Sequence, residues 1–267
     1  MHKILVFTDL HLVSAGEDII GLDPAARFAA GLAHALARHP DASHLLITGD
    51  LTHDGRADQY ARLKALLADC PLPVTMTIGN HDHRASFHAA FPDQPRDENG
   101  FVQRVIDAHG HRLILLDTVD EGGSPLHSGL LCPRRLAWLE AKLDEAPDSP
   151  TLLFMHHPPI PTGFAGMDRI GLRNRHDLAT RLRAHPQIRQ IVAGHVHRTV
   201  QGAAGGVPVA LLKSPCHQMP MVLEAGNVHL SVDEPGAYGL ILLHDGAVIV
   251  HSEDFTLSDT PLGQDGA

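Results

Sequence analysis

The chain alternates between short, continuously apolar runs and longer segments in which apolar residues recur at helical spacing. The short runs have the length and composition of buried strands. They lie at residues 3–9, 44–50, 73–80, 151–157 and 188–197. The longer segments place apolar side chains on one helical face, as Phe28, Leu32 and Leu36 do. They cover residues 24–39, 58–70, 132–146 and 176–185.

Some predicted strands have no helix between them. Residues 101–118 are typical of a hairpin that turns near Gly110, and 207–213 is followed by a second hairpin over 238–250. The alternation predicts an α/β fold with a mostly parallel sheet covered on both faces, while the late strands predict an added or second sheet. No linker or low-complexity tract divides the chain. We therefore expect one domain over 1–267, to which residues of about 200–255 add late strands.

The composition is that of an ordinary globular protein, with 43% hydrophobic and 19% charged residues. No long uncharged apolar run predicts a membrane helix. The first residues read as a strand that ends in Asp9 and His11 rather than as a signal peptide, so we expect a cytoplasmic protein without membrane contact. Three widely spaced cysteines favour neither a disulfide framework nor a zinc ribbon.

The formal charge of −10 argues against a nucleic-acid polymer as partner, because binding to its backbone needs basic patches. Bound divalent metals would reverse the local field and attract a phosphate. The chain carries 22 histidines, and histidine is the commonest metal ligand. The question is therefore which histidines can meet at one place.

Five predicted strands end in residue types that bind metals. The ends are Asp9-Leu10-His11, Gly49-Asp50, Gly79-Asn80-His81-Asp82, His156-His157 and Gly194-His195-Val196-His197. Ligands in open α/β sheets bind beyond the carboxyl ends of the strands, so these side chains are expected to converge. Each motif alone has an ordinary explanation as a turn or a helix cap. All of them together, each at a strand end, indicate a metal site.

The spacing within two of these motifs carries a geometric expectation. In an extended segment, residues two apart project to the same side. Asp9 with His11, and His195 with His197, would then each offer a pair of ligands to one site. Glycines before Asp50, Asn80 and His195 would let the backbone turn tightly as each strand ends.

This set of motifs resembles the calcineurin-like metallophosphoesterase superfamily from Asp9 to His197. The resemblance implies a four-layer α/β/β/α sandwich with a dinuclear metal site at the strand ends. By motif, one metal would be held by Asp9, His11, Asp50 and His197, and the other by Asp50, Asn80, His156 and His195. Oxygen and imidazole ligands suit Mn²⁺ or iron, with Zn²⁺ or Co²⁺ as alternatives. His157 is expected to be structural.

The resemblance also implies a reaction. Two metals clamp phosphate oxygens and activate a bridging hydroxide that attacks phosphorus. His81 matches the catalytic histidine and would contact substrate or protonate the leaving alkoxide, and Asp82 would orient its imidazole. Asn80, His81 and His217 are the predicted substrate-binding residues. His83 and Arg84 are interpreted as solvent-facing turn residues, with phosphate contact by Arg84 as the alternative.

Residues 156–174 and 213–221 are similar to the class III cyclic-nucleotide phosphodiesterases and the related bacterial glycerophosphodiesterases. The expected substrates are therefore small phosphodiesters, such as cAMP or glycerophosphodiesters. His217 matches a residue that returns to the active site, and the loop 161–174 would line its entrance. In this branch the C-terminal segment forms a cap or an oligomer contact, so a homo-oligomer, a dimer or larger, is expected.

Two other functions remain open. The same site could serve a phosphomonoesterase or a phosphonate-ester hydrolase of broad specificity. A non-catalytic binding scaffold of the same fold is the third hypothesis, but such members lose ligands or the catalytic histidine. All of these residues are present here.

Overall fold

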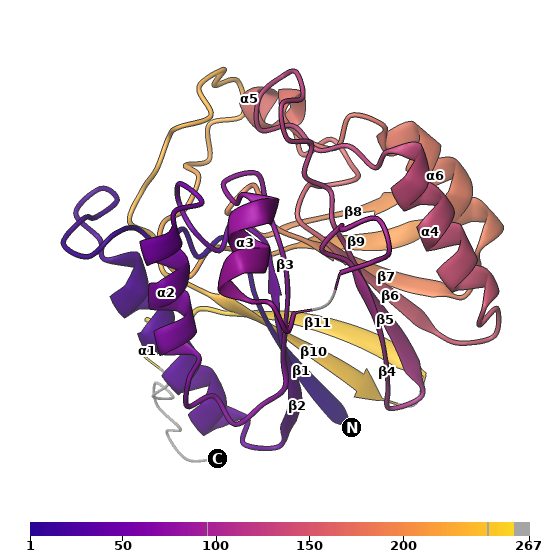
Figure 1. Cartoon of the computed structure of the whole chain (residues 1–267), viewed down its shortest axis with the longest axis horizontal. Helices are drawn as coiled ribbons and strands as arrows, with labels where there is room; N and C mark the ends of the chain where they lie inside the picture. Colours follow the sequence, from indigo (N-terminus) through magenta and orange to yellow (C-terminus); the bar gives the residue numbers. More distant parts are fainter. Residues whose placement is uncertain (95, 245, 259–267) are drawn as a thin grey trace, which may run out of the picture.

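Two β-sheets packed face to face form the centre of the fold (Figure 1). The computed structural model describes residues 1–94, 96–244 and 246–258. The first sheet has the order β11-β10-β1-β2-β3. Its strands are β1 (His2–Phe7), β2 (Ala42–Thr48), β3 (Val74–Thr77), β10 (Tyr238–His244) and β11 (Ala247–Glu253). The strands β1, β2 and β3 run parallel, and β10 and β11 extend the sheet in antiparallel pairing.

The second sheet has the order β4-β5-β6-β7-β9-β8. Its strands are β4 (Arg104–Ala108), β5 (His111–Leu116), β6 (Thr151–Met155), β7 (Ile188–Ala193), β8 (Val200–Ala204) and β9 (Val207–Leu211). The strands β5, β6, β7 and β9 run parallel, and β4 and β8 form antiparallel edges. The predicted hairpin at Gly110 is therefore confirmed as the pair β4–β5.

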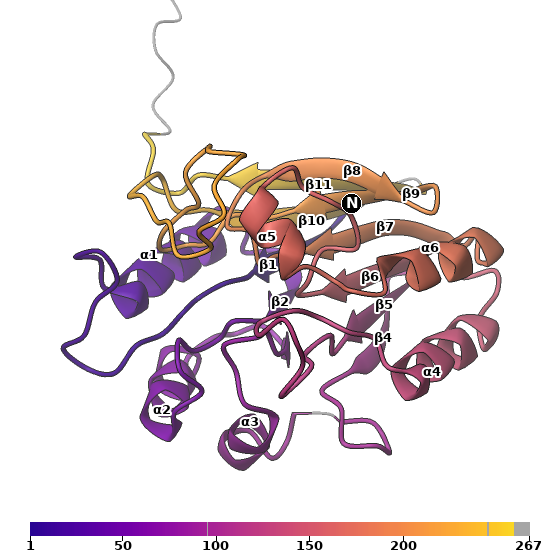
Figure 2. The same cartoon turned by 90° about the horizontal axis from the view of Figure 1, so that it is seen from above.

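Helices cover the outer face of each sheet, as Figures 1 and 2 show from two directions. The helices beside the first sheet are α1 (Pro24–Arg38), α2 (Ala57–Leu66) and α3 (Arg84–Ala90). Those beside the second are α4 (Pro133–Asp144) and α6 (Arg175–Ala184), and the short α5 (Ala165–Arg169) lies above the strand ends. Pro24 and Pro133 begin their helices, where a missing backbone N–H costs nothing.

The alternation of side chains along β1 separates the layers. Leu5 and Phe7 pack among residues of α1 and α2, whereas Ile4 and Val6 pack against strands of the second sheet. All four are buried, and burying each stabilises the fold by about 1.5–3 kcal/mol. The layers are therefore α/β/β/α, as the family resemblance implied. Each sheet is covered on both faces, as expected, but helices lie on the outer face only, because the two inner faces cover each other.

The C-terminal segment completes both sheets. β8 and β9 extend the second sheet, and β10 and β11 extend the first. Between β9 and β10 an irregular segment runs past the strand ends and contacts α5, where Ala165 N donates to Leu223 O at 2.8 Å and Gly166 N to Ala225 O at 3.0 Å. Among the described residues, no helix is long and apolar enough to cross a membrane.

The structure contradicts the interpretation of Arg84 as a solvent-facing turn residue. This residue begins α3, and its guanidinium donates to both oxygens of buried Asp117 at 2.8 and 3.0 Å and to Glu121. It is an anchor rather than a solvent-facing turn residue. His83 is exposed, as expected. The sequence around Arg84 did not indicate that its guanidinium would pair with a buried carboxylate 33 residues away, that of Asp117.

Candidate active site

The predicted metal ligands lie in the loops that follow β1, β2, β3, β6 and β7, at one edge of the two sheets. The extended geometry expected for them is wrong. Five of these residues have a left-handed backbone, with φ between 45° and 73°. They are Asp9, His11, Asp50, His195 and His197. The side chains converge because each loop turns sharply after its strand, not because residues two apart share one side of a strand.

Asp9, His11, Asp50 and His197 form the first cluster, and their candidate ligand atoms lie within 4.8 Å of one another. His11 Nε2 is 2.9 Å from His197 Nε2 and 3.5 Å from Asp50 Oδ2. His197 Nε2 lies 3.4 Å from Asp9 Oδ1. These are the four residues that the resemblance assigned to one metal.

The second cluster surrounds His156 Nε2. This atom lies 3.3 Å from Asp50 Oδ2, 3.0 Å from Asn80 Oδ1 and 3.2 Å from His195 Nδ1. Asp50 Oδ2 therefore faces both clusters, as a bridging ligand must. The set of donors matches the second predicted metal.

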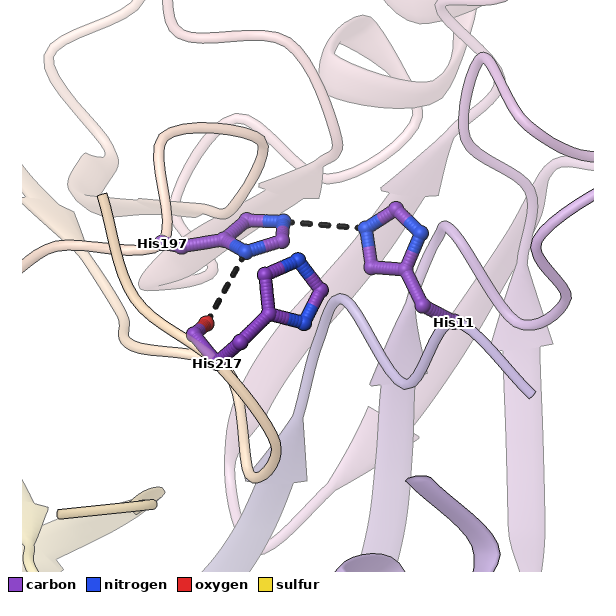
Figure 3. Close-up of side chains that lie close together, drawn as sticks. All are labelled: His11, His197 and His217. Atoms are coloured by element: carbon purple, nitrogen blue, oxygen red, sulfur yellow. Dashed lines mark hydrogen bonds between the residues drawn. The ribbon is translucent and has the colours of Figure 1, made fainter. Parts of the chain in front are cut away.

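Backbone carbonyls fix which nitrogen two of these imidazoles turn to the site. His156 Nδ1 donates to Thr48 O at 3.2 Å, and His197 Nδ1 donates to His217 O at 3.1 Å (Figure 3). A carbonyl only accepts, so the Nε2 lone pairs face the clusters. Nitrogen and oxygen acceptors then crowd one another at about 3 Å, an arrangement that a cation between them would stabilise. The donor set fits two hard or borderline metal ions.

Electrostatics support the same reading. Burial would raise the pKa of the Asp50 carboxyl, but nearby imidazoles, His156 first, hold it well below its usual range. Burial holds the pKa of His11 and His195 well below the usual value for histidine. Burial also lowers the pKa of His156, but Asp50 and Asp9 raise it more, to about 9. The ionised carboxylates favour a positive charge between them. A metal bound there would displace the proton that the raised pKa of His156 favours, because a histidine ligand must be neutral.

His81 lies beside the clusters with its ring fixed from behind. Its Nδ1 donates to His53 O at 2.7 Å, so Nε2 is the nitrogen left for a substrate. The ring stacks on two others, His53 and His127, each with its centroid 5.1 Å away and with planes inclined by 25° and 23°. The position of His81 next to the substrate site is therefore held by His53 and His127, which lie outside the motif of residues 79–82.

The predicted role of Asp82 is wrong. Within the described chain, its buried carboxylate accepts hydrogen bonds from groups on the loops after β2 and β3 and on α2, and not from the His81 ring. The donors are Leu51 N, Thr52 N, Thr52 Oγ1, Tyr60 Oη and Gly79 N, at 2.9–3.2 Å. Burial, and then Asp50, raise the pKa of this carboxyl to about 6. Asp82 joins the two loops that carry Asp50 and Asn80.

His217 returns to the site as predicted. Its ring is 4.6 Å from that of His197 and 5.3 Å from that of His11, and Figure 3 shows the three imidazoles together. Its Nδ1 is buried without a hydrogen-bond partner. His157 is buried behind the site, where it bonds to Thr118 and to the carbonyl of His127.

A cavity of about 290 Å³ opens over the clusters. Its lining includes polar residues, among them Asn80, His81 and His217, and a set of apolar ones. The apolar residues are Ile19, Ile20, Met167, Ile170, Val196, Met219, Val228 and Leu230. Among the described lining residues there is no lysine or arginine, so the positive charge that meets a phosphate would come from imidazolium groups and bound metals.

Sequence analysis missed His53 and His127, which line the same cavity. His53 lies three residues after Asp50, and a search of the loop beyond that strand could have found it. His127 follows no strand directly and offered no such signal. The carbonyls of Thr48 and His217, which orient His156 and His197, could not be predicted from the sequence either, because every residue has a backbone carbonyl.

The fold and the site can now be compared with known proteins. Residues 2–199 match the model of the calcineurin-like phosphoesterase family. The chain is 38% identical to a probable cyclic nucleotide phosphodiesterase of Rhodopseudomonas palustris, over 97% of this chain and 94% of that one. It is 30% identical to the 3′,5′-cyclic adenosine monophosphate phosphodiesterase CpdA of Escherichia coli, over 99% and 93%. The protein therefore belongs to the calcineurin-like phosphoesterase family.

One further relative and one solved structure extend the comparison. The glycerophosphodiester phosphodiesterase GpdQ of Enterobacter lignolyticus is 31% identical over 76% of this chain and 72% of its own length. A dimetal phosphatase from Danio rerio superposes with a TM-score of 0.73 at 16% identity, covering 95% of this chain and 96% of that one. The second likeness supports the fold alone. Membership of this family implies a site for two divalent metals.

Proposed function

We propose that the protein is a metal-dependent phosphodiesterase that hydrolyses small phosphodiesters, with 3′,5′-cyclic nucleotides such as cAMP as the first candidates. The observation that carries this proposal is the convergence of two ligand clusters on Asp50 with His81 beside them. Phosphodiester hydrolysis needs charge neutralisation, an activated water and a proton for the leaving oxygen. The site offers groups suited to all three.

The metal ligands are proposed to be the predicted set. One ion would lie among Asp9, His11, Asp50 and His197, and the other among Asp50, Asn80, His156 and His195. Mn²⁺ or iron suits these oxygen and imidazole donors best, with Zn²⁺ or Co²⁺ as alternatives. When bound, two such ions would supply Lewis-acid polarisation of the phosphate and lower the pKa of a bound water.

The protein's own groups would position the substrate and move the proton. Nε2 of His81 faces the cavity while Nδ1 is held by His53 O, so a protonated His81 could donate Nε2–H to the leaving alkoxide. His217 borders the same space and would contact the substrate from the opposite loop. The apolar lining residues, among them Met167 and Met219, would limit the access of water to the reacting phosphate.

The apolar residues of the lining also favour cyclic nucleotides over glycerophosphodiesters. A nucleobase would bury its faces against Ile170, Met219 and Leu230, whereas a glycerol group would leave them without a partner. The two near-full-length relatives above are both named as cyclic-nucleotide phosphodiesterases. The GpdQ relative matches only 76% of this chain, and glycerophosphodiesters remain the alternative.

A turnover panel would test the substrate. Mn²⁺-loaded protein would be given cAMP, cGMP, 2′,3′-cyclic AMP and glycerophosphoethanolamine. We expect the highest kcat/KM for a 3′,5′-cyclic nucleotide. A higher value for glycerophosphoethanolamine would support the alternative instead.

The broad phosphomonoesterase or phosphonate-ester hydrolase is tested separately. Hydrolysis rates of bis(p-nitrophenyl) phosphate, p-nitrophenyl phosphate and p-nitrophenyl phenylphosphonate would be compared. A strong preference for the monoester or the phosphonate would reject the diester proposal. A protein that holds no metal would instead support a binding scaffold.

The remaining expectations also stand as proposals. The protein is proposed to act in the cytoplasm as one domain, without a nucleic-acid polymer as partner. The exposed side chains of Met221, Val222 and Leu223, next to α5, would suit a homo-oligomer contact or a cap. Light scattering of the wild type and of Met221→Asp would test the contact, since the variant should have the smaller mass.

A further inference from the structure

His127 lies outside every strand-end motif, yet it touches two of the proposed active-site residues. It belongs to the loop between β5 and α4 and is partly buried at the cavity wall. Its backbone is left-handed, with φ +66°, a conformation that costs a residue other than glycine free energy. Such strain persists only where surrounding contacts hold it.

Those contacts come from His157. Its Nε2 donates to His127 O at 3.1 Å, while its Nδ1 meets Thr118 Oγ1 at 2.7 Å. A Cβ added at Gly129 would overlap the His157 ring, so the chain approaches this imidazole closely. The buried histidine thus fixes the position of His127.

The ring of His127 makes a hydrogen bond to Asn80. Asn80 Nδ2 donates to His127 Nδ1 at 3.1 Å, and Asn80 Oδ1 lies 3.0 Å from His156 Nε2 at the other end of the amide. An amide can be turned over with little change of shape, and only its partners decide which end faces the ligands. His127 accepts from the nitrogen and so directs the oxygen toward the second cluster.

The same ring packs on His81. The centroids are 5.1 Å apart and the planes are inclined by 23°, and His53 also stacks on His81 at the same centroid distance. His81 therefore contacts two imidazoles in addition to its bond to His53 O. Rotation of the His81 ring would break both stacking contacts.

We propose that His127 is a positioning residue with two separable effects: its Nδ1 orients the Asn80 amide for the second metal, and its ring holds His81 against the substrate. The second half of this inference rests on the proposed function, and the first half rests only on the proposed second metal site. The first half concerns metal binding and can be measured without any substrate.

Two substitutions separate the effects. His127→Asn keeps an acceptor close to the position of Nδ1 and tolerates the left-handed backbone, but it removes the ring. His127→Phe keeps a ring and removes the acceptor. His109→Asn and His109→Phe are matched controls, because His109 also has a left-handed backbone and stacks on another histidine, His2, in the β4–β5 turn.

Mn²⁺ affinity, measured by calorimetry on metal-free protein, tests the first effect. We expect His127→Phe to weaken the second site by about 10–100-fold and His127→Asn to remain near the wild type. In an Asn80→Asp background both ends of the side chain are oxygens, so His127→Phe should cause no further loss. Wild-type affinity in His127→Phe, or an equal loss in the Asn80→Asp background, would overturn this half.

Steady-state kinetics at saturating Mn²⁺ test the second effect. We expect kcat of His127→Asn to fall by about 10–100-fold with KM little changed, because a misplaced proton donor costs rate rather than binding. Wild-type kcat in this variant would overturn the second half. If the wild type binds two metals but hydrolyses no phosphodiester, the proposed function fails while the affinity comparison still decides the first half.

Discussion

Backbone strain marks the site at the scale of single residues. Eight residues other than glycine have a left-handed backbone in the described chain, and six of them are proposed ligands or His127. Each left-handed residue costs of order 1–3 kcal/mol, which the rest of the fold must offset. This strain has a function, because a loop that turns this sharply directs each ligand side chain back toward the strand ends.

Asn80→Ala should remove one ligand from the second cluster only. We expect Mn²⁺ affinity at that site to fall by more than about 100-fold, a larger loss than for a residue that acts through a ligand. Turnover should fall by orders of magnitude at low Mn²⁺. Metal content after gel filtration measures the loss, with the exposed Asn99→Ala as control. Full activity of Asn80→Ala at low metal would contradict the ligand assignment.

His81→Ala should keep both metals and lose rate. We expect kcat to fall by about 10²–10⁴-fold for cAMP, because the leaving alkoxide needs a proton. The loss should be much smaller for bis(p-nitrophenyl) phosphate, whose leaving group is stable as an anion. Metal analysis and the two rates check this prediction, and loss of a metal would make His81 a ligand instead.

The sequence predicted the residue types and their meeting place, but not how they are held. Asp50, His156 and His195 could be found because each follows an apolar strand. The hydrogen-bond donors of Asp82 could not be found from the sequence. Five of them converge on its carboxylate only after β2, α2 and β3 have packed. His127 was out of reach for the same reason.

At the scale of elements, the longer helices and the buried parallel strands were predicted well, and several short elements were not. α1, α4 and the parallel strands appear at the expected residues. Sequence analysis did not predict α3, α5 or β8, which are short and carry few buried residues. Periodicity could not decide between helices on both faces of one sheet and two sheets packed together, because buried strands read the same in both.

Gly79 shows how closely the strand ends approach one another. A Cβ added there would overlap the carboxylate and backbone nitrogen of Asp50, and a backbone atom cannot move aside easily. We expect Gly79→Ala to lower the free energy of unfolding by about 1–3 kcal/mol and to weaken metal binding. Urea unfolding with and without Mn²⁺ measures both effects.

Gly171→Ala is the matched control for Gly79→Ala. The nearest atom to its added Cβ would be 3.7 Å away, an ordinary contact. Its unfolding midpoint and metal affinity should stay close to the wild type. Equal losses in the two variants would show that the effect at Gly79 does not come from Asp50.

At the scale of the whole molecule, the proposed metals should stabilise the fold. A ligand that binds only the native state, at 100 times its dissociation constant, adds about 2.7 kcal/mol to the free energy of unfolding. We expect Mn²⁺ to raise Tm and excess chelator to lower it, with a smaller rise in Asn80→Ala. Differential scanning calorimetry checks this, and a Tm indifferent to Mn²⁺ would contradict a metal site in the native fold.

The seven proposed ligands are divided between the two sheets, with four on loops of the first and three on loops of the second. This division has a consequence for biosynthesis. A nascent chain that has emerged only as far as β5 carries Asp9, His11, Asp50 and Asn80 but lacks every ligand from the second half. Neither cluster can be completed until residue 197 has emerged from the ribosome. Metal loading should therefore follow the docking of the two sheets rather than guide it.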